Sequence, residues 1–355
     1  MKPLDLALSS IAAHAAARAH APPCRAAAGA GRGALATVAS LFTASLAATP
    51  LAAGACVQRA VEHRLHDRPP PGLVSRRQLT DDVLQTYFVY VPRRITPGAP
   101  LVVSMHGISR NADEHARRLA PLAERYGAVL VAPLFDAARF PDYQRLGRDI
   151  LASGPRGARA DLMLERIVAE VARTTPADPA RLYLFGFSGG GQFAHRFAMA
   201  YPDRVAAYAV GAAGWYTFPD ATVAFPRGTR VKRCLSGVCL DPERYLRVPA
   251  LVLVGERDIH EGTALRATAA VVAQQGESRL ERGAHWVAAM QSAARGRGFD
   301  TRFEFATLAR SSHSFTAAVR RGRLGERVFE WFFGASAPAA DATAGKPQRR
   351  WQRGQ

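Results

Sequence analysis

The chain has 355 residues, of which 48% are hydrophobic, so it can bury a sizeable core and is not expected to be disordered throughout. Its formal net charge of +18 by itself favours a nucleic-acid partner, but isolated arginines carry the excess, and we expect no nucleic-acid function. Its four cysteines are too few for a disulfide scaffold and show no C-x-x-C spacing, which excludes a common zinc motif.

The first 55 residues differ in composition from the rest of the chain. Alanine dominates them, and an uncharged apolar run from Ala34 to Ala55 ends in Ala53-Gly54-Ala55, the small residues that a signal peptidase needs. We expect residues 1–55 to be an export signal, which places the protein in the periplasm or outside the cell. The alternative is a disordered leader on a cytoplasmic protein. No stable membrane association is expected unless the leader stays uncleaved or Cys56 is lipidated.

From about Leu73 onward, strands and helices are predicted to alternate. Short apolar runs that end in glycine or proline predict buried strands, and apolar residues at helical spacing predict the helices between them. Strands are expected at 86–92, 100–107, 128–133, 181–185, 205–212, 250–258 and 301–308, and helices at 111–127, 161–173 and 190–201. The alternation predicts an α/β domain at 56–334, with a mostly parallel sheet covered by helices on both faces.

The connection before the strand at 250–258 is too long for an ordinary loop, so about 214–248 is expected to form a lid-like insertion. It carries three aromatic residues that offer apolar area and stacking to a substrate: Trp215, Tyr216 and Phe218. The alternative is that they only pack the lid onto the body. Cys234 and Cys239 either form a small disulfide there or remain unlinked thiols. The tail at 335–355 has no apolar period and is expected to be disordered.

The stretch Gly186-Phe187-Ser188-Gly189-Gly190 fits the pattern G-x-S-x-G, with the strand "RLYLF" before it and the helical sequence "GQFAHRFAMAY" after it. Glycines permit a backbone corner that is too tight for side chains. Such a corner holds the serine hydroxyl beside a helix N-terminus, whose N–H groups favour developing negative charge. A glycine turn that binds phosphate is the alternative, but no Lys-[Ser/Thr] follows. We therefore predict that Ser188 is a nucleophile on a nucleophile elbow.

A serine nucleophile needs a histidine base, which a carboxylate in turn orients. Asp258 lies just beyond Leu251–Val254, the apolar part of the strand at 250–258, and is the expected acid, with Glu256 as the rival nearer the strand end. His313 lies in a short polar loop after the strand at 301–308 and is the expected base. His285 is the other late histidine, but it sits at the start of an amphipathic helix, where packing or solvent exposure is expected.

Two backbone amides are expected to hold the oxyanion that forms during acyl transfer. The amide of Gly189 follows from the corner itself. The amide of Ile108 comes from "SMHGISRN", the loop after the strand at 100–107. His106 in the same loop is expected to brace it by hydrogen bonds rather than to transfer protons.

In the order and spacing of its oxyanion loop, nucleophile, acid and base, the chain resembles the α/β-hydrolase superfamily. Within that superfamily it resembles the polyhydroxybutyrate-depolymerase and feruloyl-esterase group. The matching pieces are "PLVVSMHG", "RYGAVLVAP", "DPARLYLFGFSGGGQFAHRFAMAYPDRV", "VPALVLVGERD" and "SSHSF", within about Leu84 to Phe333. The group's common H-G-C appears here as His106-Gly107-Ile108, and its usual cysteine pairing is not evident. These departures leave a polymer substrate open.

The resemblance and the motifs together predict a serine hydrolase that cleaves a small-molecule or oligomeric carboxylic ester through an acyl-enzyme intermediate. No metal or organic cofactor is implied. A serine peptidase or amidase of the same fold is the first alternative, and a non-catalytic interaction protein with a hydrolase fold is the second.

Overall fold

The computed structural model describes residues 68–146, 158–231, 239–259, 265 and 268–334. All of these residues belong to one compact unit, Gly54–Gln355. The predicted export signal at 1–55 and the predicted disordered tail at 335–355 lie outside the described residues. None of the helices within the described ranges combines the length and the apolar character that a membrane span needs.

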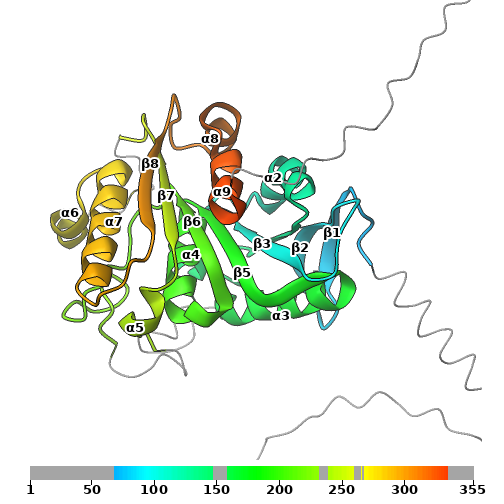
Figure 1. Ribbon diagram of the computed structural model, residues 1–355, viewed down its shortest axis with the longest axis horizontal. Helices are drawn as coiled ribbons and strands as arrows, with labels where there is room; N and C mark the ends of the chain where they lie inside the picture. The colour runs from blue at the N-terminus through cyan, green and yellow to red at the C-terminus, as the bar shows by residue number, and fades with distance from the viewer. Residues whose placement is uncertain (1–67, 147–157, 232–238, 260–264, 266–267, 335–355) are drawn as a thin grey trace, which may run out of the picture. The chain divides into compact units, whose positions relative to one another are not determined.

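Among the described residues, an eight-stranded sheet has the order β1-β2-β4-β3-β5-β6-β7-β8 (Figure 1). Its strands are β1 (Val74–Leu79), β2 (Asp82–Tyr90), β3 (Ala99–Met105), β4 (Val129–Pro133), β5 (Ala177–Phe187), β6 (Val205–Gly211), β7 (Ala250–Gly255) and β8 (Phe303–Leu308). β2 pairs antiparallel with β1 and with β4, and every pair from β4 to β8 is parallel. The predicted mostly parallel sheet is confirmed, and β1 is the strand that the prediction lacks.

Helices cover both faces of this sheet (Figure 1). They are α2 (Ala112–Tyr126), α3 (Ala160–Thr174), α4 (Gly189–Ala200), α5 (Pro242–Tyr245), α6 (Ala269–Gln275), α7 (Arg279–Arg295), α8 (Phe315–Gly322) and α9 (Leu324–Phe333), with 3-10 turns η1 (Tyr143–Arg145) and η3 (Pro202–Arg204). In β3, Leu101 and Val103 belong to a buried cluster that also contains residues of α3, α4 and α7. Val102 between them belongs to a cluster on the other face, which contains residues of α2, α8 and α9. Because successive strand residues point to opposite faces, a strand covered on both sides must be apolar throughout.

The end of α2 and the start of α7 follow local rules of helix capping. Gly127 ends α2 in the left-handed conformation, with φ of 62°, and its N–H donates to carbonyls of the last turn. The hydroxyl of Ser278 accepts from the backbone N–H of Glu281, and the Glu281 carboxylate accepts from the N–H of Ser278. This reciprocal pair fixes the first turn of α7.

The predicted lid-like insertion corresponds to the segment between β6 and β7. Tyr216 at its beginning is fixed by two backbone hydrogen bonds with the side-chain amide of Gln275 in α6, 2.8 and 2.9 Å long. Next to it, Thr217 donates its N–H to His195 of α4 at 3.0 Å and accepts from the indole N–H of Trp286 of α7 at 2.8 Å. The beginning of the segment is therefore anchored to three helices.

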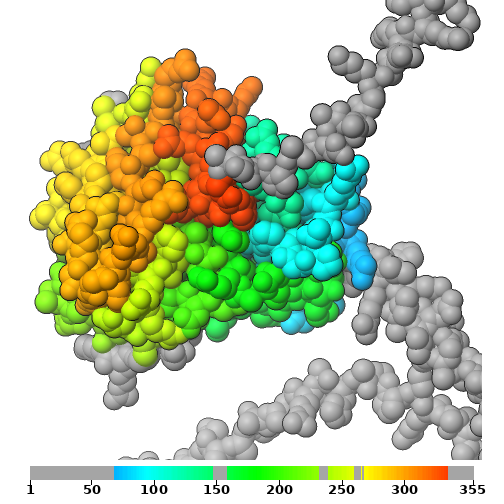
Figure 2. Space-filling view, viewed as in Figure 1, coloured from blue at the N-terminus to red at the C-terminus, as the bar shows by residue number. Residues whose placement is uncertain are grey.

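The last helix of the described chain packs against the first long one. A β-carbon placed on Gly325 of α9 would lie 2.7 Å from Leu122 Cδ1 of α2, so the two helices approach closely at this contact. The rings of Tyr126 and Phe329 extend it, with centroids 5.7 Å apart. Figure 2 shows the red C-terminal helix beside the teal surface of α2. The last described helix is thus held to the body of the domain by its packing against α2.

Candidate active site

Ser188 occupies a strained corner between β5 and α4. Its φ of 55° and ψ of −115° lie in a region that residues other than glycine rarely adopt. A β-carbon on Gly186 would lie 2.1 Å from the Gly190 carbonyl oxygen, and one on Gly190 would lie 2.1 Å from the carbonyl oxygen of Met105. These close approaches explain why glycines flank the serine. The Ser188 N–H donates to the carbonyl of Gly211 at 2.7 Å, which ties the corner to β6.

Three of the predicted site residues form one chain of hydrogen bonds. Ser188 Oγ lies 3.0 Å from His313 Nε2, and His313 Nδ1 lies 2.7 Å from Asp258 Oδ2. A carboxylate can only accept, so Nδ1 carries the proton and Nε2 is free to accept from the serine hydroxyl. The parallel strands β5, β7 and β8 bring the residues together, since their carboxyl ends lie at one edge of the sheet. This arrangement can move a proton from the serine oxygen to the imidazole.

The carboxylate of Asp258 has a second partner that the sequence did not point to. Arg279, the first residue of α7, donates to Asp258 Oδ1 at 3.0 Å. The side chains of Arg279 and Asp258 are only 4% and 2% exposed, so this is a buried ion pair. Each oxygen of the carboxylate thus has its own donor, one from His313 and one from Arg279. No short motif relates Arg279 to the rest of the site, although the Ser278 cap before it could be recognised.

The loop after β3 carries the predicted oxyanion donor Ile108. His106 in this loop is buried, and its Nε2 accepts from the N–H of Phe135 at 3.0 Å while Nδ1 lies 2.8 Å from the Gly107 carbonyl. Burial lowers the pKa of His106 to about 4, so the ring is neutral at pH 7 and acts as a brace. A β-carbon on Gly189 would lie 3.3 Å from Ile108 Cγ2, which places the two predicted donor residues next to each other.

A pocket of about 420 Å³ contains Ser188 and His313 in its wall. Its apolar lining comes from Ile108, Phe187 and Phe315, and its polar lining includes Ser109, Asn111, Glu114 and Thr316. A larger hollow of about 700 Å³ lies between β8 and α9, but it contains none of the predicted site residues. Nowhere in the described part of the chain do three or more histidine, cysteine or acidic side chains gather closely enough to hold a metal ion.

None of the three aromatics predicted to bind substrate lines the pocket beside Ser188. Tyr216 is fully buried, and its ring packs against Trp286 at 5.1 Å between centroids. Trp215 is 6% exposed with a guanidinium 4.4 Å from its ring, and Phe218 is 9% exposed. These surroundings match the packing alternative, and a role in substrate binding stays a prediction.

Comparison with known proteins places this site in a family context. The model of the family described as Esterase PHB depolymerase matches residues 85–304. Feruloyl esterase B of Talaromyces funiculosus is 32% identical over 128 residues, which cover 35% of either chain. A feruloyl esterase B of Neurospora crassa is 28% identical over 165 residues, 44% of this chain and 54% of the relative. The chain therefore spans about half or less of the length of these curated relatives.

Two solved structures are similar over most of their length. A poly(3-hydroxybutyrate) depolymerase from Bordetella parapertussis superimposes with a TM-score of 0.61 and 28% identity, over 76% of this chain and 92% of that one. Poly(aspartic acid) hydrolase-1 from Sphingomonas sp. KT-1 gives a TM-score of 0.63 at 24% identity, over 74% of this chain and 100% of that one. Together with the strand order, these likenesses show the α/β-hydrolase fold.

Proposed function

Because the chain belongs to the esterase PHB depolymerase family, we propose that it is a serine hydrolase that cleaves carboxylic esters through an acyl-enzyme intermediate. The observation that carries this proposal is the continuous hydrogen-bonded chain from Ser188 through His313 to Asp258 in the wall of a pocket. A serine hydroxyl is a weak nucleophile until a neighbouring base takes its proton, and this geometry supplies that base.

In the proposed reaction, His313 Nε2 takes the proton from Ser188 Oγ as the oxygen attacks the ester carbonyl. The carbonyl oxygen becomes an oxyanion, which the N–H groups of Ile108 and Gly189 stabilise by hydrogen bonds. His313 then returns the proton to the leaving alcohol, and the acyl group stays on Ser188. Water, deprotonated by His313, attacks the acyl carbon; the bond from that carbon to Ser188 Oγ breaks, His313 returns the proton to Oγ, and the acid is released. Asp258 holds the imidazole in the tautomer that both halves of the reaction need.

The pocket supports an ester with a compact group on one side of the carbonyl. Its volume of about 420 Å³ falls within the range of small-molecule sites, and its walls next to Ser188 are apolar. The relatives are named for feruloyl and hydroxybutyrate esters, and both are carboxylic esters. A small-molecule or oligomeric carboxylic ester is therefore the proposed substrate class.

Export to the periplasm or the medium is part of the proposal. Cys239 is disulfide-bonded, and structural disulfides persist mainly in oxidising compartments. The predicted signal at 1–55 and the other cysteines, Cys24, Cys56 and Cys234, lie outside the described residues.

The proposal is tested by turnover of p-nitrophenyl acetate and butyrate. Ser188→Ala and His313→Ala should each lose at least about three orders of magnitude in kcat, since triad members act as a unit. Ser312→Ala and His285→Ala are matched controls, because both residues are exposed and outside the pocket. Retention of more than about a tenth of wild-type activity in either triad variant would contradict the mechanism. A wild-type enzyme that cleaves a fluorogenic dipeptide but neither ester would instead favour a peptidase.

A further inference from the structure

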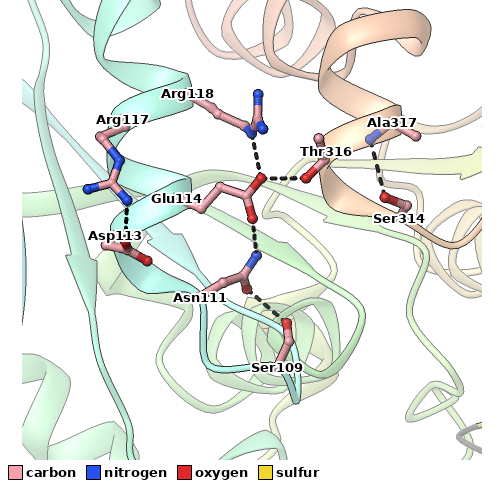
Figure 3. A network of polar contacts seen from close by, with 9 residues as sticks. All are labelled: Ser109, Asn111, Asp113, Glu114, Arg117, Arg118, Ser314, Thr316 and Ala317. Carbon is pink, nitrogen blue, oxygen red and sulfur yellow. Dashed lines mark hydrogen bonds and ion pairs between the residues drawn. The ribbon is translucent and has the colours of Figure 1, made fainter.

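Part of the wall of the pocket beside Ser188 is formed by two side chains from elements far apart in the sequence. Glu114 comes from the first turn of α2 and Thr316 from the first turn of α8, and the Thr316 hydroxyl donates to the Glu114 carboxylate (Figure 3). A second hollow, of about 740 Å³ and open on the surface of α2, is also lined by Asn111 and Glu114. Glu114 therefore belongs to the wall that separates the pocket from this second hollow.

Hydrogen bonds on several sides hold this wall in place. Glu114 Oε1 also accepts from Arg118 Nε at 2.6 Å, and Oε2 accepts from Asn111 Nδ2 at 2.8 Å. Asn111 Oδ1 in turn accepts from the hydroxyl of Ser109 at 3.0 Å, next to the oxyanion loop (Figure 3). Because the carboxylate is held by three side chains, a substrate cannot move it aside without breaking several hydrogen bonds.

The wall also gives this side of the pocket a fixed negative charge. Partial burial raises the pKa of the Glu114 carboxyl, but the hydrogen bonds from Thr316, Asn111 and Arg118 outweigh burial and bring it to about 2. The carboxylate is therefore ionised at any pH at which an esterase would work. Arg118 lines only the second hollow, whereas Glu114 lines both, so the pocket faces the carboxylate and not its partner guanidinium.

We propose that the Glu114–Thr316 contact is the wall that sets the selectivity of this pocket. This contact lets a short, uncharged acyl or alcohol group bind in the pocket, and it excludes a group that is long or that ends in a carboxylate. A longer group would have to enter the space that the contact fills, and a carboxylate would meet a like charge in a partly desolvated site. The inference rests on the proposed function, because it concerns the pocket of the same site.

The length limit is tested with two ester series at one enzyme concentration. The first varies the acyl group, from p-nitrophenyl acetate to octanoate, and the second varies the alcohol, from methyl to octyl acetate. Thr316→Ala removes the hydroxyl and methyl groups that fill the wall beside Glu114, so kcat/KM for the octyl member relative to the butyl member should rise about tenfold or more. The rise should occur in whichever series places its varied group in the pocket. Thr316→Ser keeps the hydroxyl and should keep the wild-type ratio.

The charge is tested with a matched pair of acyl groups, the p-nitrophenyl monoester of succinate and p-nitrophenyl butyrate. Both acyl chains have four carbons, and only the succinyl group ends in a carboxylate. Glu114→Gln should raise the succinate-to-butyrate ratio of kcat/KM by about tenfold, since it removes the like charge while keeping the shape. Arg117→Ala removes an exposed ion pair with Asp113 on the same helix and should leave the ratio unchanged. A ratio on one preparation does not depend on how much of the variant is folded.

Two results would overturn the inference. One is a wild-type enzyme that cleaves octyl and butyl members equally well in both series. The other is a set of Thr316→Ala and Glu114→Gln ratios that stay at the wild-type values. A wild-type enzyme that cleaves no ester in either series would instead contradict the proposed function.

Discussion

At the scale of single residues, the candidate acid is held from two sides. His313 and Arg279 each bond one oxygen of Asp258, and both the acid and the guanidinium are buried. Burying a carboxylate is costly unless a partner compensates its charge, and Arg279 supplies that partner. The arginine also leaves the carboxylate little freedom to turn away from the imidazole. In the proposed reaction, Arg279 is therefore a positioning residue, which acts through Asp258.

The first prediction concerns the removal of this arginine. Arg279→Met should lower kcat about tenfold or more while KM changes little, because substrate binding does not involve the acid. It should also cost about 3–5 kcal/mol in the free energy of unfolding, since one buried charge loses its partner. Arg279→Lys, which keeps the charge, should recover part of kcat. The rate is measured per active site after titration with a fluorophosphonate, and an unchanged kcat in Arg279→Met would show that the arginine is only structural.

Residue types and their spacing predict some of the side chains of the site but not others. Ser188, Asp258 and His313 each follow a recognisable strand, so their meeting at one sheet edge can be predicted from chain order. Arg279 belongs to a helix 21 residues after Asp258, and nothing in its local sequence separates it from the many other arginines. The contact between Glu114 and Thr316 cannot be predicted from the sequence either, because they lie 202 positions apart and only the packing of α8 brings them together.

At the scale of elements, the beginning of the segment after β6 is fixed to the helices of the domain by hydrogen bonds and packing. The side-chain amide of Gln275 bonds both backbone groups of Tyr216, as a neighbouring strand would. Trp286 packs on the Tyr216 ring and donates to the next carbonyl. The predicted lid-like insertion is thus anchored where its aromatics lie, and residues 232–238 within it are outside the described residues.

The second prediction separates packing from substrate binding in this segment. Tyr216→Ala should lower the free energy of unfolding by about 3–5 kcal/mol, because it leaves a cavity between α4 and α7. Tyr216→Phe keeps the ring and should remain close to the wild type. Neither change should alter the relative rates on acetate, butyrate and longer esters. Denaturant unfolding and an ester panel measure the two properties. A shift in ester preference at unchanged stability would support the role in substrate binding.

The period of apolar residues predicts the buried strands and the edge strand β8, but not the edge strand β1. β3 and β4 are continuous apolar runs, whereas β1 reads VSRRQL, with a pair of arginines in its middle. An edge strand needs only one packed face, so a polar sequence suffices and the apolar signal is weak. The spatial order, in which β4 lies outside β3, depends on how crossovers pack and not on any local pattern.

At the scale of the whole molecule, three buried histidines make the fold sensitive to acid. Burial lowers the pKa of His106 to about 4 and that of His115 and His195 well below their ordinary value of 6.5. All three are fully buried, and each ring lies within hydrogen-bond distance of protein groups. The folded state therefore keeps them neutral at a pH at which the unfolded chain takes up protons.

The third prediction follows from this difference in proton uptake. The contribution of the histidines is complete above the unfolded pKa of 6.5, and it declines as the pH falls, until about pH 4 for His106. Each histidine should cost about 1.4 kcal/mol per pH unit within its window. Urea unfolding at pH 7.5, 6.5, 5.5 and 4.5 measures the slope. His195→Gln should reduce the slope by about 1.4 kcal/mol per pH unit, and equal stability at pH 7.5 and 4.5 would contradict the argument.

The order of strands in the sheet also sets a time at which activity can begin. The corner that holds Ser188 is complete once β5 and β6 have emerged from the ribosome, but the base follows β8, the last strand of the described chain. A nascent chain therefore carries an unactivated serine from the synthesis of Ser188 until His313 has been added, 125 residues later. In the proposed mechanism, hydrolysis can start only when β8 joins β7, so the first turnover of substrate would report that the last strand has docked.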